Sequence, residues 1–168
     1  MVGALGALAA MPMPTIAKID GVVRGAGVAL AMAADFRFIS KASDFAITPA
    51  KLGILYPLED IKRLVNLVGQ QQAKRLLFTA AVIDTEGAKA IGLVDEVAAN
   101  LDEKVEVFTQ TLLDHSPKSI TGIKQLITRV SAGQSEDSEE TAKAFMDAYG
   151  TDDFAEGSTA FFEKRKPT

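Results

Sequence analysis

The sequence predicts an α/β core followed by a helical C-terminal region, on the basis of three observations. Residues 15–20 (TIAKID) are rich in β-branched side chains and predict a strand. Three glycines then fall within seven residues, and the stretch after them (VALAMAAD) predicts a helix buried on all sides. Residues 36–40 (FRFIS) alternate as a strand does. The order strand, glycine turn, buried helix, strand is typical of an α/β fold.

Composition and charge exclude several classes of protein to which the chain could belong. The 168 residues suffice for one domain with a real core, and 48% apolar with 24% charged residues is ordinary for a globular chain. A net charge of −4 argues against a nucleic-acid surface. With no cysteine and one histidine, His115, we expect no disulfide and no metal site. No apolar stretch is long enough to cross a membrane, so we expect a soluble cytoplasmic protein.

The remaining N-terminal elements follow from local patterns. A very apolar helix is expected over residues 2–11, where prolines end it, and the glycine turn is expected to occupy residues 21–27. An amphipathic helix over residues 58–69 is closed by Gly69. The other expected elements are a strand at 44–48, a loop at 49–57, a short helix at 71–80, a helix at 84–92 and a strand at 93–99.

Helical patterns alone account for the rest of the chain. Ser116 and Pro117 are a typical N-cap and first residue of a helix that runs through Val130. Other helices are expected over residues 102–116, 135–150 and 152–168. A change in composition near Asn100 therefore divides the chain into an α/β core at 1–100 and a helical region at 101–168.

Four segments in order resemble the crotonase superfamily, the enoyl-CoA hydratases and isomerases. They are residues 14–40, 45–57, 75–97 and 156–167. The resemblance implies a spiral of ββα units that lacks the N-terminal part of the family's fold, so that either the chain is a fragment or partners fill the gap. It also implies that the helical region assembles a homo-oligomer, a trimer or a dimer of trimers.

The resemblance gives the glycine turn a chemical role. Family members polarise the thioester carbonyl of an acyl-CoA with two backbone N–H groups, one of them in a glycine triplet at a helix N-terminus. Here the triplet reads Gly25, Ala26, Gly27, so Ala26 would supply the N–H. Arg24 precedes the turn, where it could contact a carboxylate or phosphate or form a salt bridge. Alternatives are glycines that only allow close packing, and a dinucleotide turn, whose glycine spacing is not matched.

The usual acid and base of a hydratase are missing from the matching positions. The first glutamate falls at Ala29 and the second at Pro49, a position that would line the substrate, and neither residue can move a proton. The nearest candidates for catalysis are Tyr56, Glu59 and Asp60. The alternative for the two acids is that they cap a surface helix.

The closing segment suggests how coenzyme A would be held. The resemblance assigns Phe161 to the adenine and Lys164 to the phosphates, whereas an amphipathic helix would pack Phe161 or Phe162 in a core. Coenzyme A is then part of the substrate, and no separate cofactor is expected.

Two hypotheses follow. The chain is an acyl-CoA-binding enzyme of this family that stabilises an enolate, or it is a catalytically inactive assembly module or fragment. The acyl group and the reaction, whether hydration, isomerisation, decarboxylation or hydrolysis, stay open.

Overall fold

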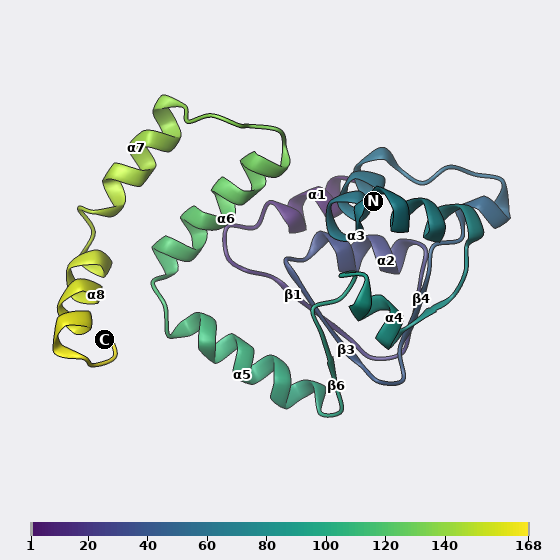
Figure 1. Ribbon diagram of the computed structural model, residues 1–168, viewed down its shortest axis with the longest axis horizontal. Coiled ribbons are helices and arrows are strands. Elements are labelled where there is room, and N and C mark those ends of the chain that lie inside the picture. The colour runs from purple at the N-terminus through teal and green to yellow at the C-terminus, as the bar shows by residue number, and fades with distance from the viewer. Residues whose placement is uncertain (1, 168) are drawn as a thin grey trace. The chain divides into compact units, whose positions relative to one another are not determined.

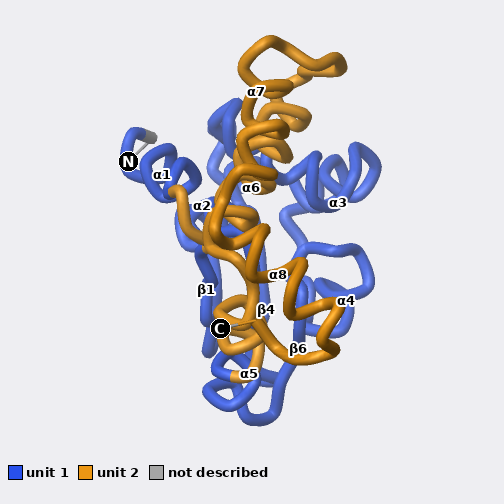
Figure 2. The backbone as a smooth tube through the Cα atoms, turned by 90° about the vertical axis from the view of Figure 1, so that its left-hand side faces the viewer, with its two compact units in different colours: residues 1–11, 15–106 blue, residues 12–14, 107–168 orange. Residues whose placement is uncertain are grey.

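The computed structural model describes residues 2–167, which divide into two compact units (Figure 2). The first contains the residues up to Met11 together with Thr15–Glu106, and the second contains Pro12–Pro14 and the residues from Val107 onward. Over the described residues, none of the helices is both long enough and apolar enough to cross a membrane.

Two small sheets form the frame of the first unit. One is parallel, in the order β1-β3-β6, and its strands lie side by side in Figure 1. The other has the order β2-β4-β5, with β2 parallel and β5 antiparallel to β4. The strands are β1 (Ile16–Ile19), β2 (Val22–Arg24), β3 (Phe36–Ser40), β4 (Asp44–Ala46), β5 (Ile83–Asp84) and β6 (Glu96–Ala98).

Helices precede, separate and follow these strands along the chain, although no helix lies between β1 and β2 or between β3 and β4. They are α1 (Val2–Ala9), α2 (Ala26–Ala33), a 3-10 turn at Pro49–Leu52, α3 (Leu58–Thr79), α4 (Thr85–Ala90) and α5 (Leu101–Leu113). Inside α3 the backbone of Gly69 leaves the helical region (φ 73°, ψ 162°), which confirms the expected break at that glycine.

The core of the first unit is built around α2. Val28 and Met32 pack with Ile39, Phe45 and Leu64 in one buried cluster. Leu5 of α1 covers Ala29 and Ala33 in a second cluster, which explains why so apolar an N-terminal helix forms. The expectation that α2 is buried on all sides is wrong in one respect, because Leu30 is 54% exposed.

Two of the strands, β2 and β5, are not predicted by the sequence. β2 lies inside the segment expected to be all turn, and β5 is only a residue pair. Both are too short to show a periodic pattern, and their stability comes from long-range pairing with β4. The true reversal between β2 and α2 is therefore confined to Gly25.

The second unit consists of helices whose apolar faces are largely open. After α5 come α6 (Pro117–Ser131), α7 (Glu139–Ala148) and α8 (Asp152–Glu163). Ser116 caps α6 as expected, since its hydroxyl accepts from the Ser119 N–H at 3.1 Å. Among the described residues of this unit only Thr141 and Ala160 are buried. The exposed apolar side chains include Leu113, Ile123, Ile127, Val130, Phe145, Met146, Phe161 and Phe162.

One buried cation ties the first unit together. Arg37 on β3 is 3% exposed. Its guanidinium donates to the carbonyls of Ala34 (2.8 Å), Asp35 (3.2 Å) and Leu93 (3.0 Å). It also pairs with the Asp95 carboxylate at 3.0 Å. Arg37 thereby links the end of α2 to the segment that leads into β6.

Arg37→Met should lower the free energy of unfolding by about 3 kcal/mol. It leaves buried carbonyls without their hydrogen-bond donor and the carboxylate of Asp95 without its ion-pair partner. Urea denaturation measures this. The matched control is Arg75→Met on the exposed surface of α3, which should change stability by less than about 0.5 kcal/mol. Equal effects of the two changes would contradict the linking role of Arg37.

Candidate functional site

The candidate site is the reversal between β2 and α2. The Gly25 N–H donates to the Ala46 carbonyl at 3.1 Å, which extends the pairing of β2 with β4 by one bond. The Gly25 carbonyl accepts from the N–H groups of Val28 (3.1 Å) and Ala29 (3.3 Å), which begins the helix. Between these bonds Gly25 has φ 47° and ψ −109°, a left-handed conformation that favours glycine. The turn is thus fixed from both sides.

Ala26 is the first residue of α2 and is exposed. Its N–H has no carbonyl acceptor within the helix, as for any first helical residue. The aligned peptide dipoles of α2 add positive potential at this end. The Ala26 amide is therefore a donor suited to an oxygen atom that carries or develops negative charge.

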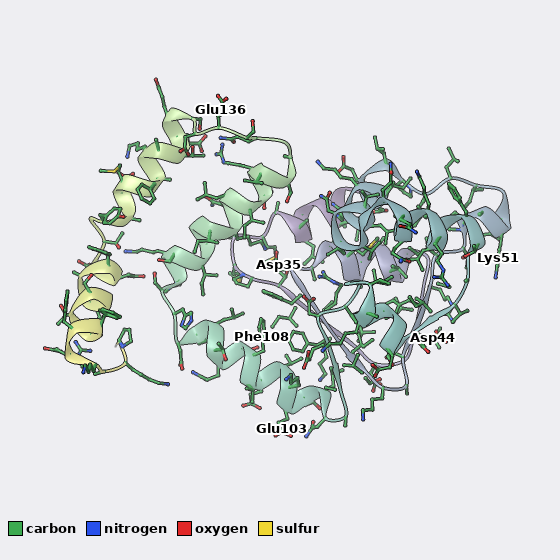
Figure 3. The ribbon with its side chains drawn as sticks, viewed as in Figure 1. Asp35, Asp44, Lys51, Glu103, Phe108 and Glu136 are labelled. Atoms are coloured by element: carbon green, nitrogen blue, oxygen red, sulfur yellow. The ribbon has the colours of Figure 1, made fainter. Side chains whose placement is uncertain are left out.

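The two neighbours of the turn have structural tasks. A Cβ on Gly27 would lie 3.3 Å from Val23 Cγ1, so Gly27 allows α2 to approach β2. Arg24 forms an ion pair with Asp44, a residue labelled in Figure 3. It also donates to the carbonyls of Val23 (3.0 Å) and Asp44 (3.2 Å). The salt-bridge alternative for Arg24 is thereby confirmed.

Tyr56 is brought to the turn from the segment before α3. Its hydroxyl donates to the Gly25 carbonyl oxygen at 3.1 Å. The half-buried ring packs against both apolar clusters of the first unit. Burial, and after it the negative charge of Asp60, raises the pKa of Tyr56 far above its usual value, so the hydroxyl stays protonated.

The two acids in the first turn of α3 have different surroundings. Asp60 is 5% exposed, and its carboxylate accepts from Arg63 at 2.8 Å. The alternative of a capping residue on a surface helix is therefore wrong for Asp60. Glu59 is exposed, in keeping with that alternative. The Asp60–Arg63 spacing of three residues could have revealed this pair from the sequence, whereas nothing local indicates the bond from Tyr56 to Gly25.

Ala29 and Pro49, the two residues at which the resemblance places the hydratase glutamates, are both buried and uncharged. Ala29 is 1% exposed and packs in the cluster under α1. Pro49 is buried at the start of the 3-10 turn. The described residues hold no group of His, Asp and Glu side chains that could bind a metal ion.

A groove of about 580 Å³ adjoins the turn and runs along β1 and β2. Arg24 and Gly27 line it beside the exposed Leu30, and its other walls are mostly apolar. β1 and β2 are the outermost strands of their sheets over the described residues, so this groove follows two sheet edges.

Phe161 and Lys164 lie at the end of α8 in the second unit. Phe161 is 79% and Phe162 is 82% exposed, so the alternative of a phenylalanine packed in a core is wrong within this chain. Phe161 lines a hollow of about 770 Å³ in that unit, together with Phe145, Tyr149 and Phe154. Lys164 ends the helix with a left-handed φ of 54°.

Known proteins match this chain along almost its whole length. The family described as enoyl-CoA hydratase/isomerase matches residues 3–168. The crotonyl-CoA hydratase of Syntrophomonas wolfei is 36% identical over 98% of this chain and 66% of its own length. The methylmalonyl-CoA decarboxylase of Escherichia coli is 31% identical over 93% of this chain and 62% of its own length.

The comparison with solved structures points to the same family. An enoyl-CoA hydratase/isomerase family protein from Hyphomonas neptunium superposes with a TM-score of 0.95 at 34% identity, over 99% of this chain and 64% of that chain. The protein therefore belongs to the enoyl-CoA hydratase/isomerase family and has a crotonase-like α/β fold. Its chain spans 62% and 66% of the length of the two relatives above.

Replacing Gly25 or Gly27 of the turn by alanine should change the stability of the protein by different amounts. Gly25→Ala should cost about 2 kcal/mol of stability, because a Cβ strains a residue at φ 47° even though the Cβ would have no atom within 4 Å outside Gly25 and its two chain neighbours. Gly27→Ala should change stability by less than about 1 kcal/mol, since the gain in helix propensity offsets the tight contact with Val23. Thermal unfolding compares them, and a more harmful Gly27→Ala would contradict this account of the turn.

Proposed function

We propose that this protein binds an acyl-CoA thioester and stabilises its enolate through the backbone N–H of Ala26. The observation that carries the proposal is the exposed first amide of α2, held by the left-handed turn at Gly25, in a member of this family. The thioester carbonyl oxygen accepts this hydrogen bond. The bond strengthens as the oxygen gains negative charge, which lowers the barrier to enolate formation.

The side chains around the turn limit the reaction. Asp60 is neutralised by Arg63, and the hydroxyl of Tyr56 is protonated and already bound to Gly25. Glu59 is the exposed carboxylate nearest in sequence to these groups. Buried Ala29 and Pro49, where the resemblance places the two hydratase glutamates, supply no carboxylate for adding water to an enoyl thioester.

Decarboxylation of a 2-carboxyacyl-CoA is the reaction that fits these residues best. The bond between the carboxylate and the α-carbon breaks, carbon dioxide leaves, and the electron pair forms the enolate without a general base. The α-carbon then takes a proton from water. One relative of this chain is named methylmalonyl-CoA decarboxylase, which agrees with this choice.

The second unit supplies the proposed coenzyme A and subunit contacts. Exposed Phe161 offers a ring for the adenine, and Lys164 offers a positive charge for the phosphates. We propose that the open apolar faces of α6 to α8 bury one another in a homo-oligomer, a trimer or a dimer of trimers.

Ala26→Pro is the sharpest test of the oxyanion donor, because proline removes the N–H yet suits the first position of a helix. Turnover of methylmalonyl-CoA and of crotonyl-CoA by the purified chain is followed by mass spectrometry. The wild type should release propionyl-CoA, and Ala26→Pro should be slower by about 100-fold. Hydration of crotonyl-CoA should be absent or much slower.

Ala26→Gly is the matched control, since it keeps the amide and should retain most of the activity. Rapid hydration of crotonyl-CoA would refute the assignment of decarboxylation while keeping the enolate site. If the folded wild type fails to bind millimolar acetyl-CoA, the inactive assembly module becomes the better description.

Self-association is tested by light scattering after size-exclusion chromatography. The wild type should have the mass of a trimer or a hexamer. Ile127→Asp, at a side chain that is 61% exposed, should shift the protein to the monomer, because a charge would be buried in the contact. Gln125→Asp on the same helix adds the same charge at an exposed polar position and should leave the mass unchanged. A monomeric wild type would overturn the proposed assembly.

A further inference from the structure

The Ala26 N–H does not stand alone, because it belongs to the same peptide unit as the Gly25 carbonyl. A peptide unit is planar, so the groups that hold its oxygen also fix the direction of its N–H. Hydrogen bonds to the oxygen draw electron density toward it and leave the N–H more positive, which makes the N–H a stronger donor. The partners of the Gly25 carbonyl therefore bear directly on the candidate site.

Three donors converge on that carbonyl. Two are the N–H groups of Val28 and Ala29, at 3.1 and 3.3 Å, which any helix supplies at its start. The third is the hydroxyl of Tyr56 at 3.1 Å, from a residue 31 positions further along the chain. Only this third bond is made by a side chain, so a single substitution can remove it and leave the two backbone bonds in place.

The surroundings of Tyr56 make it a rigid support. Its ring packs against both apolar clusters, which fixes the hydroxyl relative to α2. Neighbouring Asp60 is itself held by Arg63 and is buried. The O–H group of Tyr56 therefore donates to the Gly25 carbonyl from a fixed position.

We propose that Tyr56 is the positioning residue of the oxyanion site: its hydroxyl bond to the Gly25 carbonyl aims and polarises the Ala26 N–H. What this N–H then binds rests on the function proposed above. Tyr56 itself acts through the peptide unit, and no proton leaves it.

Tyr56→Phe removes the hydroxyl and keeps the ring. Tyr149→Phe is the matched control, because Tyr149 is the only other tyrosine and caps α7 in the second unit. The first readout needs no ligand: the amide proton resonance of Ala26 in ¹⁵N-labelled protein should move upfield in Tyr56→Phe and stay in place in Tyr149→Phe.

The second readout uses acetyl-CoA against coenzyme A, which lacks the thioester carbonyl. The preference for acetyl-CoA should fall by about three- to tenfold in Tyr56→Phe, while the affinity for coenzyme A is unchanged. The infrared carbonyl stretch of bound [1-¹³C]acetyl-CoA should lose part of its downward shift. A purely structural role would weaken both ligands alike.

An unchanged Ala26 resonance and an unchanged carbonyl stretch in folded Tyr56→Phe would overturn the positioning role. A wild type that binds neither ligand would refute the proposed function instead, and the Ala26 resonance would still test the support from Tyr56. If Tyr56→Phe does not fold, 3-fluorotyrosine is incorporated into the Tyr149→Phe protein, where it replaces Tyr56 alone. Its more acidic hydroxyl is a stronger donor and should move both signals in the opposite direction; no movement would count against the proposal.

Discussion

The pairing of β2 with β4 is the constraint on which the rest of the candidate site depends. It places the Gly25 N–H against the Ala46 carbonyl, and the chain must then reverse within one residue to enter α2. That reversal requires a left-handed glycine, and it leaves the Ala26 amide pointing away from any helical acceptor. The geometry of the Ala26 donor therefore depends on β4, a strand that is distant from it in the sequence.

The burial of most of α2 supports the role proposed for the Ala26 donor. Most of α2 lies in the core, whereas its first residues are exposed, so the amide sits at the edge of a low-dielectric interior. Hydrogen-bond donors fixed in this way stabilise a developing charge without reorganising. Arg24 is paired with Asp44, and Asp60 is paired with Arg63, so these four charges compensate one another and the exposed backbone N–H of Ala26 stays available as an electrostatic partner.

The two units differ in how far they bury their apolar side chains. The first buries many of them in two clusters, and the hydrogen bonds of Arg37 link the elements around the larger one. The second leaves large side chains such as Phe145 and Ile127 open on its helices. Capping by Ser116 and Ser138 makes these helices well defined even though little of their surface is buried, and their open faces are the basis of the assembly proposed above.

Most helices, the strands β1, β3, β4 and β6, the buried face of α2, the break at Gly69 and the family could be predicted from the sequence, because apolar periodicity, caps and glycines are local signals. It also singled out Gly25, Ala26 and Gly27. Three features are visible only in the folded chain: β2 is a strand, Asp60 is buried, and Tyr56 donates to Gly25. These features depend on contacts between residues far apart in the chain, and no local pattern records which partner a short strand or a hydroxyl will meet.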